Sequence, residues 1–236
     1  MNLAIHHRVG SFSDRWVAYC EEQCIPFKLV DCFATDIIEQ LAGVDALMWH
    51  WHQADPSEML FAKELTQVIS RMGVRVFPDV DTCWHYDDKV AQKYLFEALK
   101  MPLVPSYVFY SEGDAVEWAN QASYPKVFKL RGGAGSVNVQ LVRNRAQALR
   151  LIRQAFGRGF PSISRKAIFE DRVRQFKQKK NLNGLLGIVK CLGRFIIPSA
   201  KERFGLRQVG YAYFQEFIPH NDHDTRLVVI GQRCFG

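Results

Sequence analysis

Apolar residues in the first third of the chain form short runs separated by helical segments. These runs lie in the stretches NLAIHH, IPFKLVDCF, VDALMWHW and GVRVF, between residues 2 and 77, and have the length of β-strands. Before the last run, Leu65, Val68, Ile69 and Met72 recur at three- and four-residue spacing, which predicts a helix over Phe61–Met72. Strands that alternate with helices predict βαβ units and a small parallel sheet that ends near Pro78.

The pattern then starts again with a helix. Between Asp87 and Leu99 the apolar positions form one stripe, and Asp87 and Asp88 lie in the first turn, where carboxylates suit the helix dipole. A strand over VPSYVFY and a short helix over Gly113–Ala122 follow. A further helix is predicted over Arg145–Phe156, and the runs YAYFQEFIP and TRLVVIG close the chain as strands.

In YPKVFKLRGGAGSVNV (residues 124–139) a glycine-rich loop begins after the alternating stretch VFKL and is followed by a second one, VNVQLV, which ends at Val142. Glycines expose backbone N–H groups to an oxyanion because no side chain obstructs its approach. Lys129, on the strand that leads into the loop, is placed to reach the same anion. A plain hairpin is the alternative interpretation. The loop joins strand to strand and lacks GxxxxGK[ST], so Walker-type and Rossmann sites fit it poorly.

Polar residues also interrupt the two last apolar runs. Gln215 and Glu216 lie within YAYFQEFIP, and a carboxylate in a mostly apolar strand needs a partner. Glu216, or the backbone beside it, is a candidate acceptor for the amine of a purine. Asp224 and Arg226 alternate and therefore face one side, where they suit sugar hydroxyls and a phosphate or carboxylate.

Composition is that of a globular protein, with 48% hydrophobic and 23% charged residues. No stretch approaches the ~20 apolar residues of a transmembrane helix, and no signal peptide is evident. The six cysteines form no CxxC pair, which favours reduced thiols in a cytoplasmic protein.

Charge is distributed unevenly. Residues Arg143 to Arg207 contain 17 basic and 3 acidic residues, a net charge of +14, whereas the whole chain has a net charge of +7. This segment is either a solvated face or a contact for an anionic acceptor, such as a polyacidic glycan, nucleic acid or a membrane surface.

The order and spacing of DDK, VPSYVF, YPKVFKLRGGAGSVNV and YFQEFIPHNDHDTR resemble the ATP-grasp superfamily. The nearest likeness is to carboxylate–amine ligases of the ribosomal-protein-S6-modification and glutathione-synthetase type. The resemblance implies that Lys89 and Lys129 contact ATP phosphates and that Arg226 steadies the phosphate or acyl phosphate in catalysis. It further implies a mobile phosphate flap (Gly132, Gly133, Gly135 and Ser136), an adenine hinge (Gln215, Glu216, Phe217 and Ile218) and a ribose contact at Asp224.

The resemblance also implies an α/β fold with three parts. These are an N-terminal parallel-sheet pre-ATP-grasp domain (1–80), a first ATP-grasp lobe (81–210) with a basic insertion at about 157–207, and the start of the second lobe (211–236). Such ligases use ATP and Mg²⁺ to activate a carboxylate as an acyl phosphate, which an amine then attacks. The magnesium ligands of the family are expected beyond Gly236, so the final strands are expected to be missing, and no metal ligand is assigned here.

Two histidine-rich stretches remain. In MWHWH (Met48–His52) the purely structural interpretation places one indole in the core and one at the surface. The functional alternative is a wall for the acceptor substrate, formed with Ser11 and Ser13, because open α/β sheets bind ligands at this edge. A metal site is a lesser alternative there, and the spacing in HNDHD (220–224) matches no specific metal site.

Two functions therefore stay open. The first is an ATP-dependent ligase that joins an unknown carboxylate to an amine or similar nucleophile. The second is a non-catalytic nucleotide-binding module whose basic segment binds an anionic polymer or membrane surface. Whether the chain forms a homo-oligomer is also left open.

Overall fold

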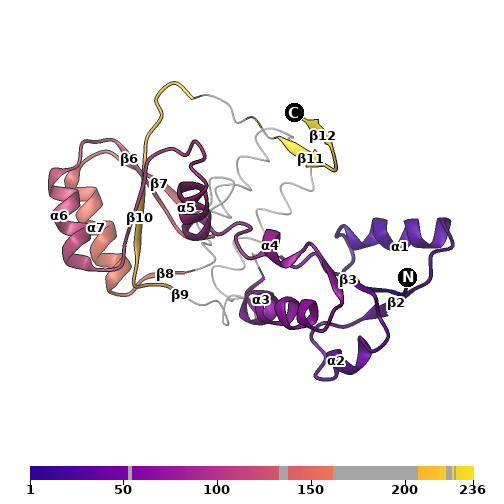
Figure 1. Cartoon of the computed structure of the whole chain (residues 1–236). Helices are drawn as coiled ribbons and strands as arrows, with labels where there is room; N and C mark the ends of the chain where they lie inside the picture. Colours follow the sequence, from indigo (N-terminus) through magenta and orange to yellow (C-terminus); the bar gives the residue numbers. More distant parts are fainter. Residues whose placement is uncertain (53–54, 133–137, 162–206, 222–224, 226) are drawn as a thin grey trace, which may run out of the picture.

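The computed structural model describes residues 1–52, 55–132, 138–161, 207–221, 225 and 227–236. Two four-stranded sheets form the centres of its two main parts, which lie at opposite ends of the molecule (Figure 1). The predicted α/β class, with a parallel sheet first, is confirmed.

The N-terminal sheet is entirely parallel. Its strands are β1 (Leu3–His6), β2 (Phe27–Val30), β3 (Ala46–Met48) and β4 (Arg75–Phe77), in the order β2-β1-β3-β4. Each lies inside one of the four predicted apolar runs. Because the strands are parallel, all four carboxyl ends meet at one edge of the sheet.

Helices cover both faces of this sheet, as a parallel sheet requires. Cys20 of α1 (Ser13–Glu22) packs with Leu3 and Ile5 on one face. On the other face Ala4 and Leu47 pack with α2 (Ile37–Gln40), α3 (Pro56–Arg71) and α4 (Val80–Cys83). Helix α3 begins earlier than predicted because Asp55 caps it, accepting the Ser57 N–H at 3.1 Å, and proline occupies its first position.

The second sheet is antiparallel and has the order β5-β10-β6-β7. Its strands are β5 (Ser106–Phe109), β6 (Lys126–Lys129), β7 (Val139–Val142) and β10 (Ala212–Glu216). Strand β10 comes last in the chain but lies between β5 and β6, and pairs Phe214 with Phe128. Strands β5 and β6 are therefore joined only through β10, a strand more than 80 residues further along the chain, and no local pattern specifies this pairing.

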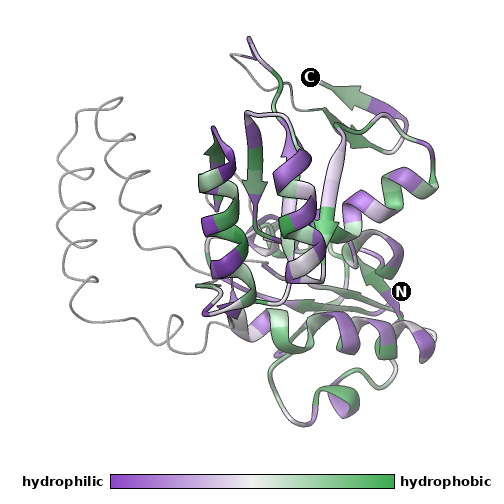
Figure 2. Cartoon of the chain, turned by 90° about the vertical axis from the view of Figure 1, so that its left-hand side faces the viewer, coloured by the Kyte–Doolittle hydropathy of each residue, from purple (hydrophilic) through white to green (hydrophobic). Residues whose placement is uncertain are grey.

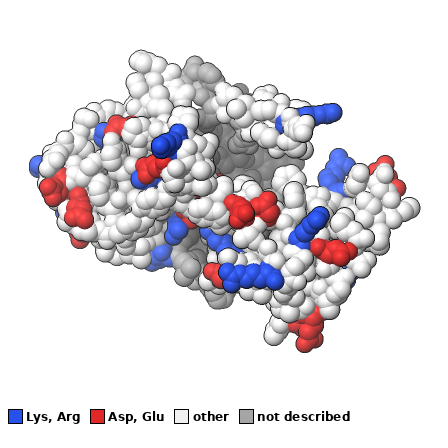
Figure 3. Space-filling view, in the orientation of Figure 1, with Lys and Arg blue, Asp and Glu red and all other residues white. Residues whose placement is uncertain are grey.

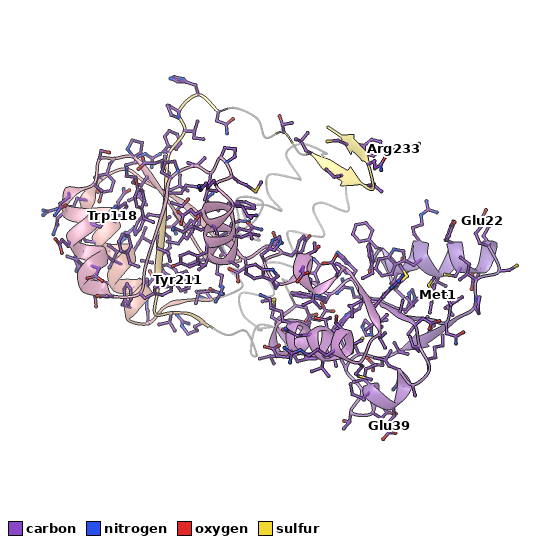
Figure 4. The ribbon with its side chains drawn as sticks, viewed as in Figure 1. Met1, Glu22, Glu39, Trp118, Tyr211 and Arg233 are labelled. Atoms are coloured by element: carbon purple, nitrogen blue, oxygen red, sulfur yellow. The ribbon has the colours of Figure 1, made fainter. Side chains whose placement is uncertain are left out.

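Helices α6 (Glu112–Gln121) and α7 (Arg145–Phe156) cover one face of this sheet. Figure 2 shows these two helices in front of the strands, with hydrophilic and hydrophobic residues mixed along each. Trp118 of α6 stacks 4.8 Å from Phe214 and is labelled in Figure 4. Because side chains alternate along a strand, the residues next to Phe128 and Phe214 point to the other face.

Four short strands complete the described chain. Strands β8 (Phe160–Pro161) and β9 (Arg207–Gln208) pair, and Gly159 before them has φ +66° with the Gln208 carbonyl 2.6 Å from where a Cβ would lie. Strands β11 (Val228–Ile230) and β12 (Arg233–Phe235) form a separate hairpin. Helix α5 (Lys89–Ala98) precedes β5 and lies beside the second sheet in Figure 1.

Candidate functional site

A polar row crosses the face of the second sheet that α6 and α7 leave uncovered. The Lys129 ammonium donates to Gln215 Oε1 at 2.5 Å, and Gln215 Nε2 donates to Ser106 Oγ at 2.9 Å. The three side chains come from β6, β10 and β5, and the strand register places them on one face. The structure thus brings together Lys129 and Gln215, two of the residues predicted for the site.

Lys89 is held next to the start of the glycine loop. It is the first residue of α5, and its backbone N–H donates to the Arg131 carbonyl at 2.9 Å. The Arg131 N–H in turn donates to the Tyr211 hydroxyl at 2.7 Å. Tyr211 is labelled in Figure 4 beside the foot of the second sheet. The Lys89 ammonium lies 3.3 Å from Gln92 Oε1 and 4.0 Å from Asp87.

Asp88 organises this junction. It is the N-cap of α5 and not part of the first turn: its Oδ1 accepts the N–H groups of Val90 and Ala91 at 3.1 and 3.0 Å. Its Oδ2 accepts Arg131 Nε at 2.7 Å and lies 3.7 Å from the Lys63 ammonium of α3. One buried carboxylate therefore joins the N-terminal part, α5 and the strand end that leads into the glycine loop.

Within the protein, the Glu216 carboxylate has two partners. Its carboxylate pairs with the Lys126 ammonium at 2.6 and 2.7 Å and accepts the Tyr107 hydroxyl at 3.0 Å. Burial, and then the Glu216 carboxylate, raise the pKa of Tyr107. Register places Lys126 opposite Glu216, on the face that α6 and α7 cover.

Sequence reasoning missed Lys126, Ser106 and Tyr211. Lys126 did carry a signal, because it is a second charge in a mostly apolar strand and, like Glu216, needs a partner. Nothing in the sequence gives the register that joins the two. Ser106 and Tyr211 carry no comparable signal.

The remaining predicted residues are only partly described. Gly132 is exposed, and a Cβ added there would meet nothing within 4 Å. The Leu130 N–H donates to the Asn138 carbonyl at 3.0 Å, which closes the base of the loop. Phe217 and Ile218 follow β10 and are exposed. Gly133, Gly135, Ser136, Asp224 and Arg226 lie outside the described residues.

The interpretation of the two indoles in MWHWH was wrong. Trp49 and Trp51 are both buried, at 0% and 4% exposure. Residues two apart share a face of an extended chain, so both indoles enter the same core and His50 points away from them.

Two absences hold for the described part of the chain. Within it, no group of three or more His, Cys, Asp or Glu side chains is arranged to hold a metal ion. None of its helices combines the length and apolar character needed to cross a membrane.

The fold is similar to that of ATP-grasp enzymes. One similar structure is the biotin carboxylase domain of 2-oxoglutarate carboxylase from Hydrogenobacter thermophilus with MgADP, ADP and bicarbonate, at a TM-score of 0.52 and 14% identity. Another is a RimK domain ATP-grasp protein from Sphaerobacter thermophilus, at 0.49 and 13%. The chain is covered over 92% and 94% of its length and spans 44% and 65% of these two proteins. No protein-family model and no curated protein matches the sequence.

Proposed function

We propose that the protein binds ATP and uses it to activate a carboxylate as an acyl phosphate, which an amine or similar nucleophile then attacks. The observation that carries this proposal is that the Lys129–Gln215–Ser106 row and the contact of the Lys89 N–H with the Arg131 carbonyl both lie where the chain enters the glycine loop. The similarity of the fold to ATP-grasp enzymes supports it.

In this proposal each part has a physical task. Lys89 and Lys129 neutralise the triphosphate, and the glycine loop, from Gly132 to Ser136, covers it with backbone N–H groups. The segment Gln215–Ile218 holds the adenine, Asp224 contacts the ribose, and Arg226 steadies the transferred phosphoryl group. Such a transfer needs positioning and charge neutralisation more than an activated side chain.

Magnesium is the metal that this chemistry implies, and it would neutralise phosphate charge. The described residues offer no carboxylate group arranged for it. We therefore assign it no ligand in this chain and derive no step through it.

The first test is a substitution of Lys129. Lys129→Ala removes a charge-assisted contact to phosphate, so we expect ADP binding, measured by calorimetry, to weaken by roughly 2 kcal/mol. Lys28→Ala is the matched control, because Lys28 is exposed on β2 of the other sheet.

Equal affinity of the Lys129→Ala variant and the wild type for ADP would remove Lys129 from the site. If Lys28→Ala weakens ADP binding by the same amount, the loss of affinity comes from the lower net charge of the protein and not from a contact of Lys129.

One observation favours a second candidate, a nucleotide-binding module that docks on an anionic polymer. Helix α7 carries Arg145, Arg150 and Arg153, all of which are exposed. No ion pair among the described residues includes them, and the sequence contains no Asp or Glu between Glu117 and Glu170. Uncompensated guanidinium groups suit phosphate or carboxylate polymers.

A further inference from the structure

A second polar cluster lies at the carboxyl edge of the N-terminal sheet, apart from the nucleotide site. It contains Arg8, which follows β1, and His50, which follows β3, together with Ser13 and Glu58 from the first turns of α1 and α3. Ligands of open α/β sheets bind at this edge because the loops that follow neighbouring strands converge there.

The Arg8 side chain is held in place. Its Nη1 donates to Glu58 Oε1 at 3.1 Å, and the other oxygen of this nearly buried carboxylate accepts the His52 N–H. The Arg8 N–H donates to the hydroxyl of Ser13 at 2.9 Å. The Arg8 side chain nevertheless keeps 35% of its surface exposed, so part of it stays accessible to a ligand.

His50 has an unused polar atom, and it follows β3 where Arg8 follows the paired strand β1, with Ile5 opposite Met48. Its Nδ1 is buried and has no hydrogen-bond partner in the described structure. Burial, followed by the charge of Arg8, lowers the pKa of His50 and keeps the ring neutral. A buried polar atom without a partner is costly, and a ligand group is one way to satisfy it.

Apolar side chains border the cluster. Phe12 lies edge-on to His50 with ring centroids 4.7 Å apart, and it is 63% exposed. Val9 is 85% exposed. An arginine, a histidine and an exposed ring next to each other suit a small molecule that has one acidic group on an apolar frame.

The charge balance selects the kind of acid. Glu58 pairs with Arg8, and Asp14, which lies 3.8 Å from His7 Nε2, adds a second negative charge nearby. Arg8, Glu58 and Asp14 together carry a formal net charge of −1, so the cluster repels a doubly charged group more strongly than a singly charged one. This disfavours a phosphate monoester relative to a carboxylate, which a guanidinium binds through paired N–H···O bonds.

We propose that Arg8 and His50 form a binding site for the carboxylate of a small organic substrate, with Phe12 against its carbon frame. The proposal rests on the proposed function, in which a carboxylate compound is a substrate. Helix α3 supports the link between the two sites: Glu58 lies in its first turn, and Lys63, about 7.5 Å further along the axis, contacts Asp88 beside the glycine loop.

The test uses the full chain with ¹³C-labelled histidine and sodium pentanoate, a monocarboxylate on an apolar frame, as the probe. Pentanoate is expected to shift the His50 ring resonance in a saturable manner, whereas its neutral amide, pentanamide, leaves it unchanged. Arg8→Gln should weaken pentanoate binding at least tenfold. Arg75→Gln, the same change at the opposite edge of the sheet, should leave it unchanged.

Arg8→Gln leaves the Glu58 carboxylate without its arginine, so the double variant Arg8→Gln/Glu58→Gln provides a neutral, similarly shaped cluster. Loss of pentanoate binding in this folded double variant supports the proposal. Binding equal to that of the wild type overturns it, as does a stronger shift with inorganic phosphate or with pentanamide than with pentanoate.

ADP binding separates the two proposals. Arg8→Gln should bind ADP like the wild type, because Arg8 takes no part in the Lys129 site. If the wild type binds pentanoate at His50 but no ADP, the proposed function fails and the carboxylate site stands. If it binds ADP but pentanoate never shifts His50, the carboxylate site fails alone.

Discussion

Single residues in this protein show how burial decides the state of a titratable group. His6 ends β1, and its Nδ1 accepts the Cys32 N–H at 3.0 Å. Burial lowers the pKa of His6, and this effect outweighs Asp31, whose carboxylate lies 3.8 Å away and raises it. The ring is therefore neutral in the folded protein and accepts a hydrogen bond that protonation would break.

This predicts a loss of stability below neutral pH. The folded state resists protonation of His6, so the unfolded state binds more protons as the pH falls below about 6.5. The contribution is fully present above that pH and is lost as the pH falls. His6→Asn keeps an acceptor near the position of Nδ1 and removes the titration. We expect this variant to lose less free energy of unfolding between pH 7.5 and 5.5 than the wild type, measured by urea denaturation.

His6→Asn also removes the ring contacts of His6 with Trp49 and Phe33, which lowers the free energy of unfolding at every pH. This loss cancels when the free energies of one protein at the two pH values are subtracted. His50, whose pKa burial also lowers, contributes with the same sign in both proteins. An identical loss in both proteins would show that His6 is not the titrating group.

At the scale of elements, the start of α5 joins several parts of the described chain. Asp88 caps the helix and pairs with Arg131, and through it Lys89 is fixed beside the glycine loop. Capping, an ion pair and the candidate site thus depend on one side chain. The sequence predicted the helix and the acidic start, but not the contact with Arg131.

Two substitutions separate these roles. Asp88→Asn keeps a capping oxygen and loses the charge, whereas Asp88→Ala loses both. We expect Asp88→Ala to lower the free energy of unfolding by roughly 2 kcal/mol and Asp88→Asn by about half as much. Urea denaturation measures both.

Ser111→Ala is the control, because Ser111 caps α6 by accepting the Asp114 N–H and, as an uncharged residue, contributes a cap alone. It should cost about 1 kcal/mol. Equal costs for Ser111→Ala and Asp88→Ala would mean that the pairing of Asp88 with Arg131 adds nothing.

At the scale of the whole molecule, the N-terminal part mixes acidic and basic side chains, whereas α7 carries basic ones without acidic neighbours in sequence. On the face in Figure 3, acidic and basic side chains are interspersed over the N-terminal part of the described chain. Helix α7 differs, because its arginines have no acidic neighbours in sequence.

The domain limits 1–80, 81–210 and 211–236 stay predictions. Cys83 packs in the core of the N-terminal part, which favours a first boundary after that residue.

Arg145, Arg150 and Arg153 supply the test of polymer binding. Replacing all three with Gln should make the protein elute from a heparin column at lower NaCl concentration, because fewer counterions are released on binding. Replacing Lys28, Arg75 and Lys100, which are exposed elsewhere, is the matched control for net charge. Equal elution of the two triple variants would contradict a polymer site on α7.

Much of the fold followed from local pattern. The helix over Arg145–Phe156 was predicted to the residue, and each strand of both four-stranded sheets lies within a predicted apolar run or loop flank. Such elements depend on periodicity and capping, which neighbouring residues determine. The start of α3 was predicted five residues too late, because it depends on Asp55 and Pro56 and not on the apolar stripe of the helix.

The sequence by itself determined the order of elements, the parallel N-terminal sheet and the lysine next to a glycine loop, because all of these are local patterns. Only the tertiary structure decided that Lys129 meets Gln215 while Glu216 meets Lys126 on the opposite face. It also decided that Arg8 and His50 share one edge of a sheet. These pairings depend on strand register and on contacts between residues 40 to 90 positions apart, which side-chain periodicity does not specify.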